Sequence, residues 1–398
     1  IPTVFATSFI LFQGPRRVRM SVVIGLTATL APTIGPTLGG WLSDTFSWHW
    51  LFLINVPVGT AVALTVWNTL DIDRGDRGLM ARFDWWGLAF MAGFLGSLEY
   101  VMEEGPRWDW FGDPIIATFA LVCAACGVAF FWHVLTRRDP IVELRAFKDR
   151  NFAFGSLFSL IMGVGLYGAV YLIPLFLGRV RGYDSLQIGE VMAITGICMF
   201  AGAPVAGRLA RAMDLRVMLA IGLTVFGVSV WMTARLTAQS SFAELALPLG
   251  LRGFAMMFIM LPVNQVALGT LAPSVLKNAS GLYNLMRNLG GAVGLALINQ
   301  LAQDRSYLHR VQLGEQVGWG RIGATNYLDT LSAALANRMD SVDADTAALR
   351  RLYAIVQREA LILAYNDVLH LMALLFFLAV PLVFLVKRPS TGGGGEAH

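Results

Sequence analysis

Three polar side chains share one face of the penultimate apolar segment, 279–302. Asn284, Arg287 and Asn288 have the spacing i, i+3, i+4, which places them together on one side of a helix. A charge inside a membrane helix is costly unless it faces the protein interior or a watery cavity. The spacing therefore predicts the wall of a cavity or a polar contact between helices. The alternative is that Arg287 snorkels toward the membrane surface.

Two further charged residues lie inside apolar segments. Asp367 follows Tyr365 and Asn366, one to two turns into the last apolar segment. A carboxylate at that depth could bind a proton or a cationic ligand, or it could be a hydrated acid at the interface. Arg252 lies well inside another segment, 243–268, and could pair with Asp367 or with Glu244.

Amide and aromatic side chains suggest contacts with an apolar small molecule. Asn264 and Gln265 closely follow Pro262, where they could satisfy the backbone groups that a Pro frees, or line a cavity. Tyr167 and Tyr171 lie one helical turn apart, and such rings suit a pocket that accepts varied apolar ligands. We therefore treat all four as candidate substrate contacts.

The sequence contains no pattern that is typical of an enzyme. It has no Gly-rich phosphate loop with a Lys, and its five His residues lack the spacing of metal ligands. We therefore expect no catalytic residues, no metal and no organic cofactor. An active transporter with this sequence would draw its energy from an ion gradient.

Composition points to a protein that crosses a membrane several times. Hydrophobic residues make up 56% of the chain, charged residues 14%, and the mean hydropathy is +0.62. A soluble domain has roughly a quarter charged residues. The formal charge of +4 is spread over short loops, so the sequence does not predict a nucleic-acid partner.

About twenty apolar residues cross a bilayer, which divides the chain into about ten full spans and one partial span. The partial span is 1–12. The full spans are 20–42, 50–70, 85–103, 114–136, 152–178, 185–207, 215–235, 243–268, 279–302 and 361–386. Lys and Arg concentrate in alternate short loops, including the one between 136 and 152. By the positive-inside rule those loops and the C-terminus are cytoplasmic.

One long polar connection, 303–360, breaks the pattern on the predicted outer side. Within it, 328–339 and 345–359 look amphipathic and helical. A connection of this length without a function is uncommon, so an outer cap or partner surface and a passive insertion are both open. The tail 387–398 is Gly-rich and predicted to be flexible and cytoplasmic.

Residues 31–59 read APTIGPTLGGWLSDTFSWHWLFLINVPVG, which predicts two helices joined by a tight hairpin. A Pro such as Pro36 removes a backbone hydrogen bond and kinks a helix. Gly35 and Gly39 are four residues apart, with Gly40 beside them, and glycines at this spacing let a second backbone approach closely. The first helix therefore has a kinked face with few side chains.

Four segments of the sequence resemble motifs of a known family. Residues 35–40, GPTLGG, resemble the fifth-helix antiporter motif of the major facilitator superfamily. Residues 48–59 are similar to the start of the sixth helix in its fourteen-helix drug:proton antiporters, the EmrB/QacA group. Residues 140–153 resemble that group's linker into the C-terminal bundle, and 279–291 its penultimate-helix motif. The Gly-rich ending is most EmrB-like.

The resemblance implies an all-α polytopic fold of two helical bundles with two extra helices between them. Residues 1–70 would be the remnant of the N-terminal bundle, because the chain starts at Ile1 inside an apolar segment and about three helices of the family would precede it. Residues 71–150 would hold cytoplasmic loops and the extra helices, and 151–386 the C-terminal six-helix bundle.

The resemblance also implies proton-driven export of hydrophobic or amphipathic drugs across the bacterial inner membrane. The expected partners are the lipid bilayer, the drug, protons, and a periplasmic adaptor with an outer-membrane channel that 303–360 would face. In the family, the motif of Gly35, Pro36, Gly39 and Gly40 helps to seal one side of the cavity. Alternatives are an exporter of a siderophore, aromatic acid or lipid on the same fold, an uptake symporter, and a receptor or scaffold that transports nothing.

Overall fold

The described residues of the computed structural model are helical and include no strand, which confirms the predicted all-α class. They are Met20, Val23, Thr27, 34–35, 37–69, 83–108, 110–137, 140–269, 271, 273–317, 321–337 and 339–387. The predicted partial span 1–12, most of the predicted span 20–42, and most of the tail 387–398 lie outside them.

Seven of the described helical segments are long and apolar enough to cross a membrane, which confirms a polytopic membrane protein. They contain α3 (Trp50–Leu53) with α4 (Asn55–Thr69), α7 (Pro114–Thr136), α8 (Arg150–Phe176), α9 (Ser185–Ala212), α10 (Leu215–Thr233), α11 (Phe242–Leu268) and α14 (Ser341–Ala379). Two less apolar helices cover the predicted spans 85–103 and 279–302. They are α6 (Trp85–Glu104) and α12 (Pro273–Gln316).

Aspartates begin five consecutive helices. The side chains of Asp84, Asp113, Asp149, Asp184 and Asp214 cap α6, α7, α8, α9 and α10. An Asp at this position accepts a hydrogen bond from a backbone N–H that has no partner within the helix, and its charge complements the helix dipole. These short polar breaks fix where each apolar segment starts.

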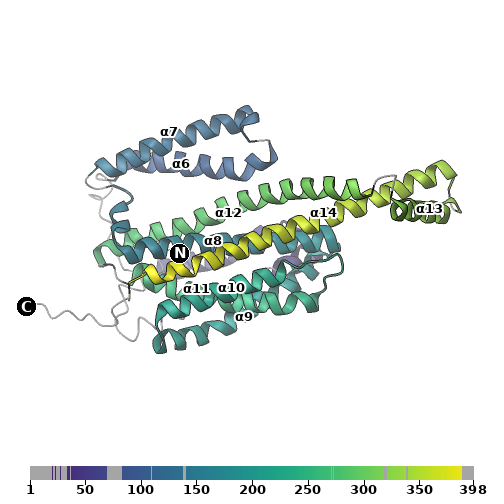
Figure 1. Cartoon of the computed structure of the whole chain (residues 1–398). Helices are drawn as coiled ribbons and strands as arrows, with labels where there is room; N and C mark the ends of the chain where they lie inside the picture. The colour runs from purple at the N-terminus through teal and green to yellow at the C-terminus, as the bar shows by residue number, and fades with distance from the viewer. Residues whose placement is uncertain are drawn as a thin grey trace, which may run out of the picture.

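The six helices α8 to α12 and α14 lie alongside one another and form the main bundle (Figure 1). Its core is aromatic at the crossing of α10 and α14, where the rings of Phe226 and Phe376 stack with centroids 4.2 Å apart. Both rings are almost completely buried. The α6–α7 hairpin lies on one flank, at the top of Figure 1.

The long polar connection 303–360 is mostly helical. Helix α12 continues to Gln316, α13 covers Ile322–Ala336, and α14 begins at Ser341, about twenty residues before the start predicted for the last span. No Gly or Pro interrupts 341–379, so the amphipathic part and the apolar part form one helix. Figure 1 shows α12 and α14 projecting beyond the bundle, where α13 packs against α14.

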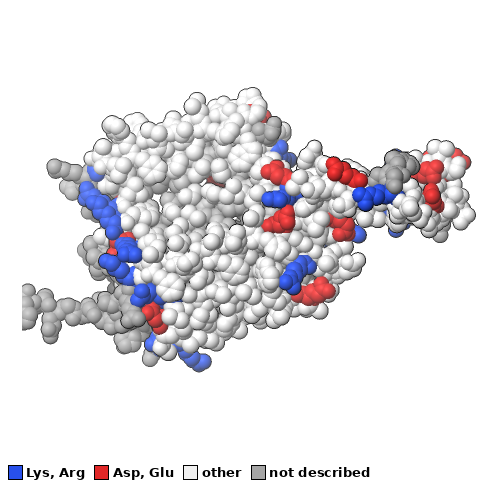
Figure 2. Space-filling model, in the orientation of Figure 1, with Lys and Arg blue, Asp and Glu red and all other residues white. Residues whose placement is uncertain are grey.

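Charge is concentrated at the two ends of the molecule (Figure 2). Lys and Arg follow the end at which α14 finishes. The opposite end and the projecting helices carry acidic and basic residues together, and the surface between is largely uncharged. This is the distribution expected when an apolar belt lies in a bilayer.

Candidate functional site

Helices α8 and α12 touch through their backbones. A Cβ atom on Gly163 of α8 would lie 2.1 Å from the carbonyl oxygen of Arg287, and one on Gly290 of α12 would lie 2.1 Å from that of Leu160. No side chain larger than hydrogen fits at either point. This close crossing brings the polar face of α12 against the tyrosines of α8.

The three polar residues predicted to share a face belong to this crossing. The Arg287 guanidinium donates to Oδ1 of Asn284. Asn284 is only 8% exposed. Asn288 Oδ1 accepts from the hydroxyl of Tyr167 at 3.4 Å. Arg287 takes part in no ion pair within the described residues. The arrangement is a network of amide and phenol groups around one cation, Arg287, which has no carboxylate partner within the described residues.

Tyr171 extends the same polar track toward the projecting helices. Its hydroxyl donates to Asn299 Oδ1 at 2.6 Å, and both residues border a cavity of about 320 Å³ that Arg179 and Arg310 also line. Sequence reasoning missed Asn299, although it follows Asn288 by eleven residues and so falls on nearly the same helix face. We call Tyr167, Tyr171, Asn284, Arg287, Asn288 and Asn299 the polar seam.

Asp367 pairs with the projecting part of α12. Its carboxylate lies 2.8 Å from His309 Nε2 and 3.8 Å from Arg305 Nη1, and its side chain is about one-third exposed. The interaction was not foreseen because His309 and Arg305 fall in the segment assigned to a loop. The structure therefore places Asp367 in an acid–base cluster near the start of the projection.

The pairing of Arg252 with Asp367 or Glu244, which the sequence left open, is absent from the ion pairs of the described residues. Arg252 is 4% exposed, and its guanidinium donates to Thr195 Oγ1 at 3.0 Å. The reason is geometric, because Arg252 lies on the side of α11 that packs on α9, whereas Asp367 packs with α12. Asn264 and Gln265, on the same helix as Arg252, are half-buried, and among the described hydrogen bonds none joins their side chains to the polar seam.

The glycine motif contacts the beginning of α9. A Cβ atom on Gly40 would lie 2.4 Å from the carbonyl oxygen of Ser185, whereas one on Gly39 would lie 3.5 Å from the Leu51 side chain. One on Gly35 would meet nothing within 4 Å, and Pro36 lies outside the described residues. The close contact between backbones is therefore at Gly40. The sequence predicts it on the adjacent helix face, which carries Gly35 and Gly39.

Two hydrogen bonds hold this contact together. The hydroxyl of Thr37 donates to the carbonyl oxygen of Gly189 at 3.1 Å, and the backbone N–H of Leu186 donates to Asp44 Oδ2 at 3.1 Å. Leu186 lies in the first turn of α9, where a carboxylate is favoured by the helix dipole. Helical residues 37–45 thus bind one specific end of the main bundle.

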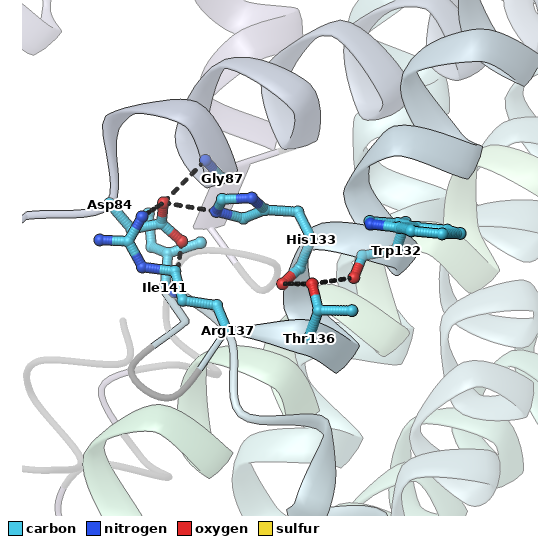
Figure 3. A network of polar contacts seen from close by, with 7 residues as sticks. All are labelled: Asp84, Gly87, Trp132, His133, Thr136, Arg137 and Ile141. Atoms are coloured by element: carbon cyan, nitrogen blue, oxygen red, sulfur yellow. Dashed lines mark hydrogen bonds and ion pairs between the residues drawn. The ribbon is translucent and has the colours of Figure 1, made fainter.

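A buried carboxylate that sequence reasoning missed joins α6, α7 and the linker that follows them (Figure 3). Asp84 is 3% exposed and accepts from the Gly87 N–H at 3.0 Å, the Ile141 N–H at 3.2 Å and His133 Nε2 at 2.8 Å. Arg137 Nη1 lies 3.1 Å away. Burial raises the pKa of Asp84, but hydrogen bonds from Gly87, His133 and Ile141 outweigh it and hold the pKa below its ordinary value of 3.8.

The described residues include no cluster of three or more His, Cys, Asp or Glu side chains that could hold a metal ion. The polar seam offers hydrogen bonding, the charge of Arg287, and aromatic contact through Tyr167 and Tyr171. Such a surface can bind and release a solute without altering it.

Comparison with known proteins gives a consistent result. Residues 1–295 match the Major Facilitator Superfamily. The chain is 38% identical to the colistin resistance protein EmrB of Acinetobacter baumannii, over 98% of this chain and 75% of that protein. It is 32% identical to the multidrug export protein EmrB of Escherichia coli, over 94% and 72%. It is 27% identical to the fatty acid resistance protein FarB of Neisseria gonorrhoeae, over 96% and 74%.

Proposed function

The chain is an EmrB-like member of the major facilitator superfamily, and on that premise we propose that it exports hydrophobic or amphipathic drugs in exchange for protons. The observation that carries the proposal is the polar seam between α8 and α12. Its phenol and amide groups lie within the predicted membrane spans 152–178 and 279–302, and polar side chains at that depth mark solute pathways. No catalysis is proposed, because members of this superfamily move solutes.

We propose that the seam and its surroundings form the substrate path. Tyr167 is 40% exposed, so its ring is accessible to a ligand while its hydroxyl is oriented by Asn288. Arg287 supplies a positive charge beside these rings, and its guanidinium is held by Asn284. Asn264 and Gln265 lie half-buried on α11 and would support the same path from the neighbouring helix. Arg252, by contrast, would hold α11 against α9 through Thr195.

The direction of transport is proposed from the glycine motif. The contact of Gly40 with Ser185 joins the helical residues 37–45 to the main bundle at one end of α9. A contact of this kind seals one side of a cavity while the other side stays open. The two EmrB relatives are named for colistin resistance and multidrug export, so the siderophore, aromatic-acid and lipid exporters, an uptake symporter and the non-transporting scaffold are not favoured.

We propose that the protein lies in the inner membrane with its C-terminus in the cytoplasm. Lys and Arg gather at the end at which α14 finishes (Figure 2), as the positive-inside rule requires of a cytoplasmic surface. The projecting parts of α12 and α14, with α13, would then stand in the periplasm. We propose that this projection faces a periplasmic adaptor and, through it, an outer-membrane channel.

Proton exchange is assigned to the cluster of Asp367 and His309, since both side chains can gain or lose a proton and lie within hydrogen-bond distance. Replacing Asp367 by Asn keeps the size of the side chain and removes the negative charge. We expect a loss of at least about tenfold in proton-driven dye efflux, which corresponds to roughly 1.4 kcal/mol of lost coupling. The measurement is ethidium efflux from energised cells, corrected for the amount of protein in the membrane.

The matched control is Asp343→Asn, which removes the same charge from the exposed first turn of α14. It should leave efflux unchanged. Equal efflux in the wild type and in Asp367→Asn would remove Asp367 from the coupling path.

A further inference from the structure

The α6–α7 hairpin presents an apolar groove of about 680 Å³ on the flank of the molecule. Phe94 and Leu98 of α6 form one wall, and Cys123, Gly127, Phe131 and Leu135 of α7 form the other. The lining residues of α7 run from Ala120 to Leu135, a length of roughly 22 Å at 1.5 Å per residue. One leaflet of the hydrocarbon core is about 15 Å thick, so the groove is long enough for a whole acyl chain.

Small side chains make the groove hollow. Ala120, Cys123, Ala124 and Gly127 recur at helical spacing along α7, and a Cβ atom on Gly127 would lie only 3.0 Å from the ring of Phe94. The groove is therefore a consequence of the tight α6–α7 packing. Trp132, 73% exposed, lines its end near the linker, where an indole ring suits the membrane–water interface.

A second, basic cavity of about 140 Å³ begins where the groove ends. Leu135 lines both cavities, and Arg137, Arg145 and Lys148 surround the second one together with Glu143. Arg137 is held by Asp84 at 3.1 Å, but Arg145 and Lys148 are exposed and form no ion pair within the described part of the chain. Glu143 offsets one charge, which leaves an excess of positive charge at the end of an apolar channel.

Asp84 fixes the positions of the groove and the basic cavity relative to each other. It caps α6, binds His133 and Arg137 at the end of α7, and accepts from the N–H of Ile141 in the linker (Figure 3). The linker residues Arg145 and Lys148 are thereby kept close to the end of the groove. A lipid-facing surface without such fixed cations would bind neutral and anionic lipids alike.

We propose that this continuous surface binds one anionic phospholipid of the cytoplasmic leaflet. Its phosphate group would lie against Arg145 and Lys148, and one acyl chain would fill the groove between α6 and α7. Basic pockets beside membrane helices on the cytoplasmic side favour anionic headgroups, and that leaflet carries them. The assignment of the leaflet rests on the proposed orientation, but the binding itself does not depend on drug transport.

The test is native mass spectrometry of the purified protein in detergent, titrated with dioleoyl phosphatidylglycerol or dioleoyl phosphatidylcholine. The wild type should retain one phosphatidylglycerol molecule in preference to phosphatidylcholine. Because each cation near a membrane surface contributes about fivefold to the binding of an anionic lipid, Arg145→Gln with Lys148→Gln should weaken phosphatidylglycerol binding roughly 25-fold. Binding of phosphatidylcholine should not change.

Two matched controls separate this site from general effects. Arg208→Gln with Arg211→Gln removes the same charge from exposed positions in the last turns of α9, and should leave phosphatidylglycerol binding unchanged. Ala124→Trp fills the groove and should weaken binding of both lipids, whereas Ala125→Trp, next to it on the exposed surface but outside the groove, should not. Glycerol phosphate, the headgroup without acyl chains, should fail to displace the lipid.

Equal losses of phosphatidylglycerol in the two charge variants would overturn the proposal, as would equal affinity of the wild type for both lipids. Displacement by glycerol phosphate would show an anion site without a lipid site and would also overturn it. Because binding is measured without a gradient or a drug, these results are independent of whether the protein exports drugs.

Discussion

Replacing Gly40 by Val is expected to abolish drug efflux while the protein still inserts into the membrane. The added side chain would begin 2.4 Å from the carbonyl oxygen of Ser185, a backbone atom that cannot rotate away. Overpacking of this kind costs about 1–3 kcal/mol. A penalty of about 2 kcal/mol on the sealed arrangement would shift its population roughly 30-fold. The measurement is ethidium efflux, normalised to the amount of protein in the membrane.

Gly39 provides the matched control for this prediction. Its Cβ would meet only the end of the Leu51 side chain at 3.5 Å, an ordinary contact distance. We therefore expect Gly39→Ala to transport normally, whereas the bulkier Gly39→Leu would reduce efflux by displacing the hairpin. Efflux at the wild-type level in Gly40→Val would show that the contact with α9 does not gate transport.

Replacing Gly290 by Val is expected to prevent folding of the C-terminal bundle. A Cβ at this position would lie 2.1 Å from the carbonyl oxygen of Leu160, so α8 and α12 would have to separate. Separation would also break the contact of Gly163 with the backbone of Arg287 and the hydrogen bond from Tyr167 to Asn288. The expected readout is the loss of a monodisperse peak when the detergent-extracted protein is run on a size-exclusion column.

Gly281 lies on the same helix, but a Cβ there would meet nothing within 4 Å. Gly281→Val should therefore give the same chromatographic profile as the wild type. If Gly290→Val were extracted and eluted as well as Gly281→Val, the close crossing of α8 and α12 would not be needed for the fold.

Apolar length and composition were enough to predict the helical class and the seven apolar membrane-length helices of the described residues, because a bilayer accepts few other structures. They could not predict that α12 continues to Gln316, or that the amphipathic segment 345–359 and the last span form one helix that begins at Ser341. Residues 303–316 and 341–360 are polar, yet no Gly or Pro breaks either helix within those ranges except Gly314 near the end of α12. Hydropathy shows where the chain leaves the membrane. It does not show where the helix ends, because a helix can continue into water.

Helical spacing placed Asn284, Arg287 and Asn288 on one face, since that relation depends on one helix alone. The partners of a side chain depend on which helix packs beside it, and this cannot be read from spacing. Arg252 therefore looked free to pair with Asp367, but α11 packs on α9 and the contact is with Thr195. Asp84 was missed for the same reason, because His133 and Ile141 are far from it in sequence.

The central claim, drug export driven by protons, is tested most directly by ethidium efflux from cells that produce the protein, measured before and after addition of a protonophore. An exporter driven by the proton gradient must lose its driving force when that gradient collapses. We predict that efflux stops and that ethidium re-enters the cells within the measurement. Efflux that continues at the same rate after the protonophore is added would contradict proton antiport.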